Sequence, residues 1–267
     1  MTSLRAARAT LRKDLLVVAS HRGRLPLAAV GIVVTLLVLS GNARFIGDAM
    51  SERLPYTQGG YLAFLVLGIA VFAFHDALVR ELPARIRAAR SEGTLEAMLG
   101  ARGDLRDAAF TLALFPLVGT LTRVGSIVLL GSLAFDLELA WENLPLVLPV
   151  VATGALVFCG VGLLFAAAII AGCRAEPVLA LYGAFSGLLG GVFFPVEVLP
   201  GWIASLGVLV PVGHVLGPIR HALQGGDIAI GEDLLTLALL ATIILPLALL
   251  ALRHALARAL RDGTLTR

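Results

Sequence analysis

Long apolar runs constrain this chain more than any other feature of its sequence. The apolar residues come in runs of about 18 to 28, and a helix of about 20 such residues spans the hydrocarbon core of a bilayer. Hydrophobic residues make up 58% of the 267 residues and charged residues only 15%, with a mean hydropathy of +0.94. Because a water-soluble domain of this length carries more charge, we predict an all-α membrane protein.

Six of these runs are predicted to be transmembrane helices. They cover residues 25–46, 59–79, 108–135, 144–172, 178–194 and 234–252. The fourth and fifth runs are joined by a very short connection, residues 173–177, so these two helices are expected to be antiparallel neighbours. Residues 25–267 are therefore treated as one six-helix membrane domain.

Residues 1–24 precede the first span and are predicted to form an amphipathic helix on the membrane surface. Apolar side chains recur on one helical face and arginines line its flank: Leu4, Leu11, Leu15 and Val18, against Arg5, Arg8 and Arg12. The alternative is the basic n-region of a signal peptide, but the segment is long and no small-x-small cleavage site follows clearly. We expect the helix to be retained.

Residues 195–231 are apolar but are interrupted by prolines and glycines. Four prolines fall in this stretch, namely Pro195, Pro200, Pro211 and Pro218. Proline removes a backbone donor and breaks a helix interior, so an uninterrupted spanning helix is not expected. We predict instead a pair of short helices that re-enters the membrane or lies at its surface.

The distribution of arginine predicts the orientation of the chain. With both termini in the cytoplasm, seventeen of the 21 basic residues lie on the cytoplasmic side and three, Arg44, Arg53 and Arg220, lie outside. This asymmetry is the positive-inside signature of a multi-pass protein, here assigned to the plasma membrane. No aromatic residues are interleaved with the basic ones, so we expect no nucleic-acid partner.

The sequence has no motif for ATP chemistry or for a metal site. The single lysine, Lys13, follows Arg12 without the glycine-rich loop of a Walker motif. The five histidines are scattered, without the spacing of a metalloprotease or a nucleophile elbow. We therefore expect a chain that is not an enzyme and holds no cofactor, so that any ATP dependence comes from a partner.

Charged residues inside or beside the apolar runs are candidate functional groups. Arg123 lies well inside the third run, where a charge is costly and often functional. If that helix starts late, however, Arg123 reaches the inner interface as a structural residue, which is the interpretation we favour. His75 and Asp76 near the end of the second run are interpreted as an interfacial pair, with Asp76 bonded to Arg80 one turn later, rather than as a proton relay.

Three glycines form a stripe on one face of the fifth run. Gly183, Gly187 and Gly191 recur at intervals of four residues, which lets another helix approach closely. The partner helix belongs either to the same chain or to a second subunit, or the stripe lines a translocation path. The sequence does not favour one of these over the other.

Two segments resemble the permease subunits of type-2 ABC exporters, the class that includes bacterial drug, lipid and polysaccharide export permeases. The first is Arg90-Ser-Glu-Gly-Thr-Leu-Glu-Ala-Met-Leu99, which is similar to the cytoplasmic coupling segment of that family. The second is Gly190-Gly-Val-Phe-Phe-Pro195, continuing through Leu199-Pro-Gly-Trp202, which is similar to the fifth-span exit and the outer re-entrant helices.

The resemblance implies a function and a set of site residues. It implies that residues 84–102 dock on a separate ATP-binding subunit, present in two copies, which holds ATP and Mg beneath a permease homodimer surrounded by membrane lipid. The implied coupling residues are Glu92, Gly93, Thr94, Leu95, Glu96, Met98 and Leu99. The implied outer re-entrant residues are Phe194, Pro195, Pro200 and Trp202. The exported cargo is expected to be lipid-like, drug-like or a polysaccharide.

Other classes of membrane protein stay open from the residues alone. An ion-coupled secondary transporter or channel needs no ATPase and uses Arg123 and Asp76 as coupling or selectivity residues. A membrane scaffold or assembly factor is the third possibility. No internal repeat is found at a fixed period, which disfavours an inverted-repeat transporter.

Overall fold

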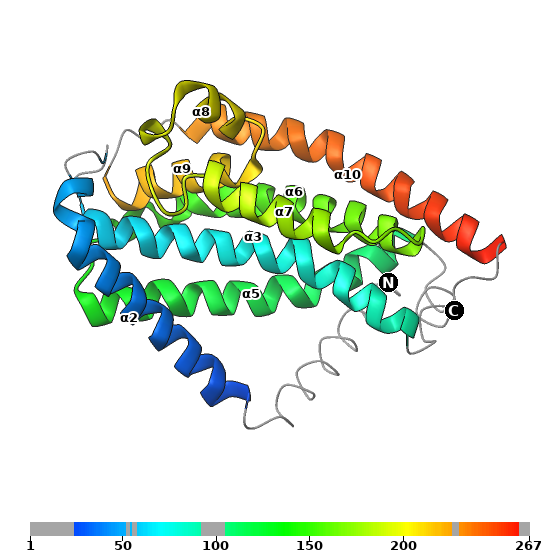
Figure 1. Cartoon of the computed structure of the whole chain (residues 1–267), viewed down its shortest axis with the longest axis horizontal. Coiled ribbons are helices and arrows are strands. Elements are labelled where there is room, and N and C mark those ends of the chain that lie inside the picture. Colours follow the sequence, from blue (N-terminus) through cyan, green and yellow to red (C-terminus); the bar gives the residue numbers. More distant parts are fainter. Residues whose placement is uncertain (1–23, 52–53, 55–57, 92–104, 226–229, 262–267) are drawn as a thin grey trace.

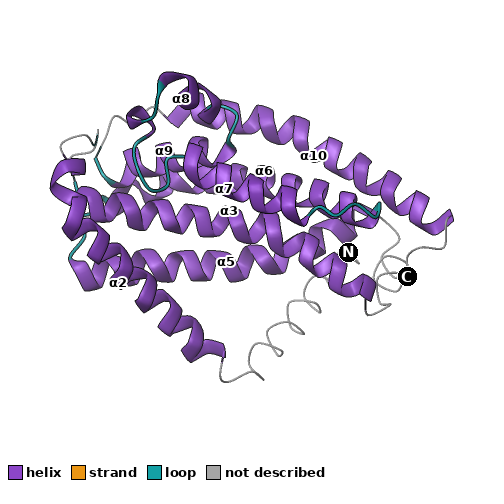
Figure 2. Cartoon of the chain, in the orientation of Figure 1, coloured by secondary structure: helices purple, strands orange, loops and turns teal. Residues whose placement is uncertain are grey.

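The apolar runs fold into long helices that lie side by side (Figure 1). The computed structural model describes residues 24–51, 54, 58–91, 105–225 and 230–261. Within these residues the chain consists of helices and loops without any strand, as Figure 2 shows, so the all-α prediction is confirmed for this part. The predicted N-terminal interfacial helix, apart from its last residue, lies outside the described part.

The long helices follow the predicted runs closely. In chain order the elements are α2 (Arg24–Ser51), α3 (Gly60–Ser91), α5 (Leu105–Phe135), η1 (Trp141–Asn143), α6 (Leu144–Ile170), α7 (Glu176–Leu189), η2 (Val196–Val198), α8 (Gly201–Gly207), α9 (Pro211–Leu223) and α10 (Ile230–Arg261). Five of them, α2, α3, α5, α6 and α10, are long and apolar enough to cross a membrane. These lengths are those of a multi-pass membrane protein.

The segment around α7, α8 and α9 departs from a simple sixth span. The helix α7 has only 14 residues and ends at Leu189, short of the predicted end at residue 194. It stops because the chain turns at Gly190 and Gly191, and Gly191 has a φ of +69° that favours glycine. The axes of α8 and α9 then differ in direction by 89°. The chain has a sixth span only if this bent pair is counted as a single span. Two short helices are what the prolines predict.

Two helices form the centre of the bundle and the others surround them. In their spanning windows, 72% of α3 and 67% of α6 is buried, against 17% for each of α2, α5 and α10. Glycine allows the two central helices to approach closely, because a Cβ on Gly162 would lie 2.5 Å from the backbone oxygen of Leu78. The exposed apolar faces of the outer helices are suited to lipid or to another subunit.

The bundle has two chemically different ends. We call one end the hairpin end, because the bent pair of α8 and α9 lies there (Figure 1). It also holds the start of α3 and the connection between α5 and α6. The basic end is the opposite one, where α3, α6 and α10 finish and where α5 and α7 begin. There α3 runs far beyond its apolar part and ends at Ser91. The stretch that follows the second predicted span, from residue 80 onward, therefore begins as an extension of α3.

Arg220 on α9 holds the hairpin end together. Its side chain is only 3% exposed, although the sequence analysis counted it among the outside charges. Its Nη1 donates to the carbonyl of Gly191 at 2.7 Å, and its Nη2 donates to the carbonyls of Phe64 at 2.8 Å and Val192 at 3.1 Å. The guanidinium also lies 3.3 Å from the centre of the Phe64 ring. One side chain thus joins α9, the loop after α7, and α3.

Replacing Arg220 is expected to destabilise the whole hairpin end. Hydrogen bonds from a charged donor contribute about 1.5 to 3 kcal/mol each, so Arg220→Met should cost on the order of 3 kcal/mol or more. Arg220→Lys should recover only part of this, because an ammonium lacks the planar fork. The measurement is the thermal unfolding midpoint of the detergent-purified protein, with Arg44→Met, which removes an exposed arginine of α2, as the control. Equal midpoints for Arg220→Met and Arg44→Met would contradict this role.

Candidate functional site

A largely apolar cavity lies at the hairpin end between α2, α3 and the loop after α7. Its volume is about 510 Å³. The residues that line it are Val34, Thr35, Val38, Leu39, Asn42, Ile46, Tyr61, Leu65, Ile69, Phe193 and Phe194. Among the described residues, no charged side chain lines the cavity, so it suits an apolar or amphipathic molecule rather than an ion.

The polar groups of the cavity are mostly occupied by the protein itself. Thr35 Oγ1 donates to the Gly31 carbonyl at 2.8 Å, and Asn42 Nδ2 donates to the Val38 carbonyl at 2.9 Å. The Tyr61 hydroxyl donates to the carbonyl of Phe193 at 2.9 Å, which ties the start of α3 to the loop after α7. These bonds shape the wall and leave few donors for a polar ligand.

The residues predicted for the outer segment lie around this cavity and on α8. Phe194 lines the cavity. Pro195 and Pro200 adopt extended backbone and directly precede η2 and α8, where each marks the start of a new short element. Trp202 is 72% exposed in the first turn of α8, a position typical of a tryptophan at a membrane interface.

The glycine stripe of α7 faces α3 within the same chain. A Cβ on Gly183 would lie 2.6 Å from Arg80 Nη2, and one on Gly187 would lie 3.3 Å from the Phe72 ring. Gly191 lies beyond the helix, where its carbonyl accepts from Arg220. The opposite face of α7 is apolar and exposed through Val178, Leu181, Phe185 and Leu188. This second face, which the sequence analysis did not single out, is the one free for another subunit.

Charged side chains pair near the basic end. The predicted ion pair between Asp76 and Arg80 is present. Arg87 at the end of α3 lies 2.9 Å from Glu176 at the start of α7. Arg123 is exposed on α5 and lies within electrostatic range of Glu81 on α3, together with Arg85. Arg123 thus has an acidic neighbour within the bundle, which lowers the cost of a charge at this depth.

The predicted coupling residues lie outside the described part of the chain. These are Glu92, Gly93, Thr94, Leu95, Glu96, Met98 and Leu99. The structure does describe the helix that leads to them, because α3 ends at Ser91, one residue earlier. The same helix lines the apolar cavity with Tyr61, Leu65 and Ile69. The cavity and the predicted coupling segment are therefore joined by a single helix.

His75 is a core residue rather than the interfacial one that the sequence indicated. Its side chain is 0% exposed and is surrounded by aromatic rings, with the centre of Phe158 at 4.9 Å and that of Tyr182 at 5.5 Å. Neither ring nitrogen of His75 has a hydrogen-bond partner among the described residues. His75 is therefore a buried polar group whose hydrogen-bonding capacity the described residues do not satisfy.

Comparison with known proteins does not assign this chain to a family. No protein-family model matches the chain, and no curated protein sequence matches it. Among the described residues, no group of three or more histidine, cysteine, aspartate or glutamate side chains is arranged to hold a metal ion. The apolar cavity and the helix that connects it to the basic end are thus the features on which a functional assignment depends.

Replacing His75 by phenylalanine is expected to preserve or raise stability. A buried polar group without a partner costs about 1 to 3 kcal/mol, and phenylalanine fills a similar volume among the aromatic rings. His75→Ala should instead lower the thermal unfolding midpoint, because it leaves a cavity. Both midpoints are measured on the purified protein in detergent. If His75→Phe is destabilised as much as His75→Ala, then the imidazole has a polar partner in the folded protein.

Proposed function

We propose that this chain is the transmembrane permease subunit of an ATP-driven ABC exporter. It acts as a homodimer with two separate ATP-binding subunits, which hold ATP and Mg. One observation carries the proposal: α3 lines an uncharged cavity at one end of the bundle and continues to the coupling segment, residues 84–102, at the other. The helix α3 continues through Pro83 without a break and so links the two ends, which lets movement at one end change the cavity.

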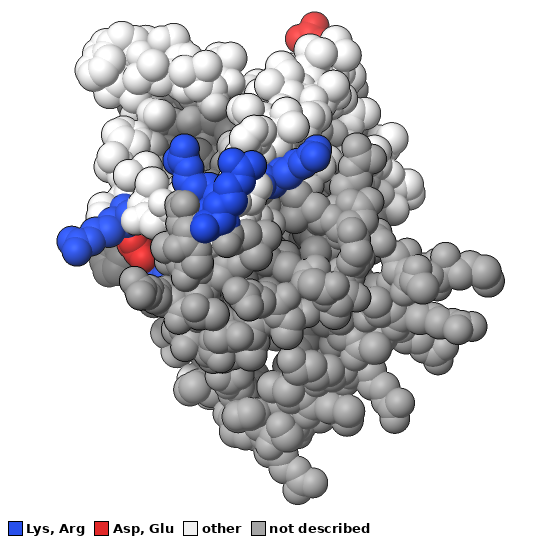
Figure 3. Space-filling model, turned by 90° about the vertical axis from the view of Figure 1, so that its right-hand side faces the viewer, with Lys and Arg blue, Asp and Glu red and all other residues white. Residues whose placement is uncertain are grey.

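The basic end is assigned to the cytoplasm, and the hairpin end to the outside, of the plasma membrane. Figure 3 looks onto the basic end and shows Lys and Arg side chains gathered there, with acidic side chains sparse among those coloured. The positive-inside rule places such a surface in the cytoplasm. The proposal keeps the orientation that the arginine distribution predicts, with both termini in the cytoplasm, and takes α8 and α9 as the outer re-entrant segment.

The exposed faces of α2 and α7 support a second permease copy as partner. On α2, Val33, Val34 and Leu37 are each at least 50% exposed, beside the cavity. The face of α7 defined by Val178, Leu181, Phe185 and Leu188 is exposed as well. Two copies that meet through these faces enclose the cavities between them and remove apolar surface from lipid.

Export then follows from movement of the coupling segment. ATP binding draws the two ATPase subunits together, which shifts residues 84–102 and with them the end of α3. This changes the width of the path beside α2, and a substrate from the cytoplasm or the inner leaflet leaves toward the hairpin end. The uncharged lining favours lipid-like or drug-like cargo; a polysaccharide needs the polar edges of Thr35 and Asn42.

The test asks whether binding of the ATP-binding partner requires the two predicted coupling glutamates. The double variant Glu92→Ala and Glu96→Ala should lose a stoichiometric ATP-binding subunit, and its ATPase activity, on affinity purification in mild detergent. The matched control removes two exposed glutamates of the hairpin end, Glu138→Ala and Glu142→Ala, and should keep the partner.

Two results would overturn the proposal. One is an unmodified chain that purifies as an oligomer without any ATPase and whose transport follows an ion gradient, which indicates a secondary transporter. The other is a partner that remains bound to the Glu92 and Glu96 double variant as firmly as to the control.

A further inference from the structure

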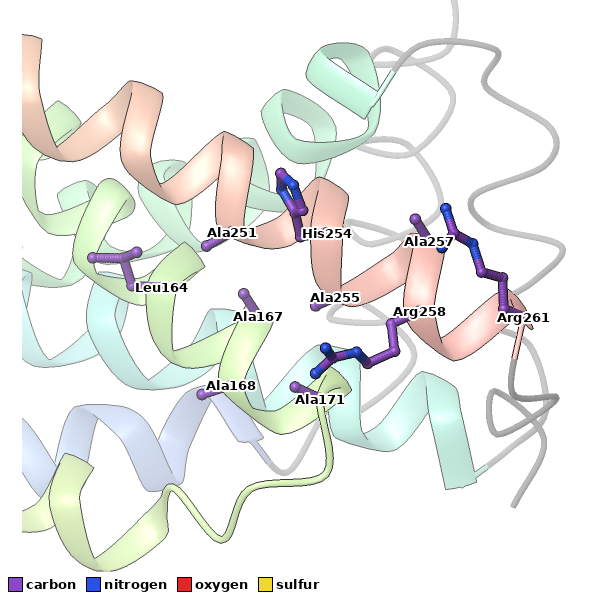
Figure 4. A pocket seen from close by; sticks show the side chains of 10 residues that line it. All are labelled: Leu164, Ala167, Ala168, Ala171, Ala251, His254, Ala255, Ala257, Arg258 and Arg261. Carbon is purple, nitrogen blue, oxygen red and sulfur yellow. The ribbon is translucent and has the colours of Figure 1, made fainter.

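A second pocket lies at the basic end, between α6 and α10, away from the apolar cavity. Its volume is about 610 Å³. Figure 4 shows its floor of alanine side chains, with Ala167 on α6, Ala171 directly after α6, and Ala251 and Ala255 on α10. Because alanine is so short, the two helices leave open space between them at this level. The floor of the pocket is therefore apolar, while His254, Arg258 and Arg261 contribute polar atoms to its lining.

Arginine side chains stand at the rim of this pocket. In Figure 4, Arg258 extends from α10 toward Ala171 at the end of α6, and Arg261 lies one turn further along α10. Among the described residues, no carboxylate lies within 4 Å of either guanidinium, whereas Arg80 and Arg87 pair with Asp76 and Glu176. The rim thus carries positive charge that the described part of the protein does not neutralise.

The pocket lies where the apolar part of α10 ends. The spanning stretch of this helix runs from Ile230 to Ala259, so Arg258 and Arg261 lie at the level of the lipid headgroups. Leu247 and Leu250 lie one turn earlier on the same face as Ala251 and His254, and both are more than half exposed. An apolar track thus leads along α10 into the pocket.

We propose that this pocket binds an anionic phospholipid of the leaflet at the basic end. The arginine guanidinium matches a phosphate oxygen pair through two parallel hydrogen bonds, and the alanine floor accommodates the glycerol and the first methylenes. The acyl chains lie along Leu247 and Leu250. Basic pockets between helices at the membrane surface suit lipid phosphate, because the headgroup pairs with the charge while the chains stay in the bilayer. This inference does not depend on the export function.

A specific lipid site can be distinguished from a general effect of the arginines at the basic end by comparing an arginine inside the pocket with one outside it. Arg253 lies on the same helix, is exposed and is not part of the pocket lining. Removing it changes the net charge as much as removing Arg258 does. Attraction of the whole basic end to anionic lipid should therefore respond equally to both substitutions, and a specific pocket should respond to only one.

The experiment compares Arg258→Gln with Arg253→Gln in the purified full-length chain. Each protein is titrated in detergent with dioleoylphosphatidylglycerol, and the thermal unfolding midpoint gives the apparent affinity. The unmodified chain and Arg253→Gln should be stabilised alike, whereas Arg258→Gln should bind at least about fivefold more weakly. Dioleoylphosphatidylcholine should stabilise all three proteins less. Midpoints without added lipid should agree, because both arginines are exposed.

Two outcomes would overturn the site. If Arg253→Gln and Arg258→Gln weaken phosphatidylglycerol binding equally, the effect comes from net charge and not from the pocket. The second outcome is that inorganic phosphate alone stabilises the unmodified chain as much as the lipid does, and that only Arg258→Gln abolishes this stabilisation. The pocket is then an anion site and not a lipid site.

Discussion

The hairpin end depends on the fork of hydrogen bonds that Arg220 makes. The chain leaves its helical path at Gly190, so the carbonyls of Gly191 and Val192 need donors that an apolar bundle does not offer. Arg220 supplies them from α9 and reaches the carbonyl of Phe64 with the same group. The buried charge is tolerable because both terminal nitrogens, Nη1 and Nη2, donate to carbonyls and because the guanidinium lies against the Phe64 ring.

The wall of the candidate cavity follows from this arrangement. Phe193 and Phe194 come directly after the two carbonyls that Arg220 holds, and the Tyr61 hydroxyl fixes the Phe193 carbonyl as well. The loop is thereby held against α3, the helix that also continues to the basic end. The helix α2 closes the cavity on its other side. Only 17% of its spanning window is buried, so α2 can move in the proposed mechanism with little loss of packing.

Local sequence pattern predicted the helices but not the contacts between distant segments. The apolar runs located the long helices because burial in lipid requires them, and the prolines predicted the broken segment at α8 and α9. The Asp76 and Arg80 pair was predictable because it spans one helical turn. Arg220 was counted among the outside charges, and its burial was not predicted because its partner Phe64 is 156 residues away, a separation that no periodicity reveals.

Two other differences have similar causes. The apolar run of α3 stops near residue 79, but alanine, arginine and glutamate favour helix, so α3 continues to Ser91 without needing lipid around it. His75 was assigned to the interface because histidine is polar and has a charged neighbour. Its ring instead faces Phe158 and Tyr182, from helices far along the chain. The coupling residues themselves stay a prediction from resemblance.

The central claim is that ATP, bound by a partner, moves the cavity beside α2. The most direct measurement is the rate at which a thiol reagent labels Val38→Cys, a half-exposed cavity position, in membranes after the free Cys159 and Cys173 are replaced by serine. Ile243→Cys, exposed on α10 and not part of the cavity lining, is the control. ATP with Mg is expected to change the labelling rate only at residue 38, and Glu92→Ala with Glu96→Ala is expected to remove the change. A labelling rate at residue 38 that is unchanged by ATP and changes with an ion gradient would contradict the proposed mechanism.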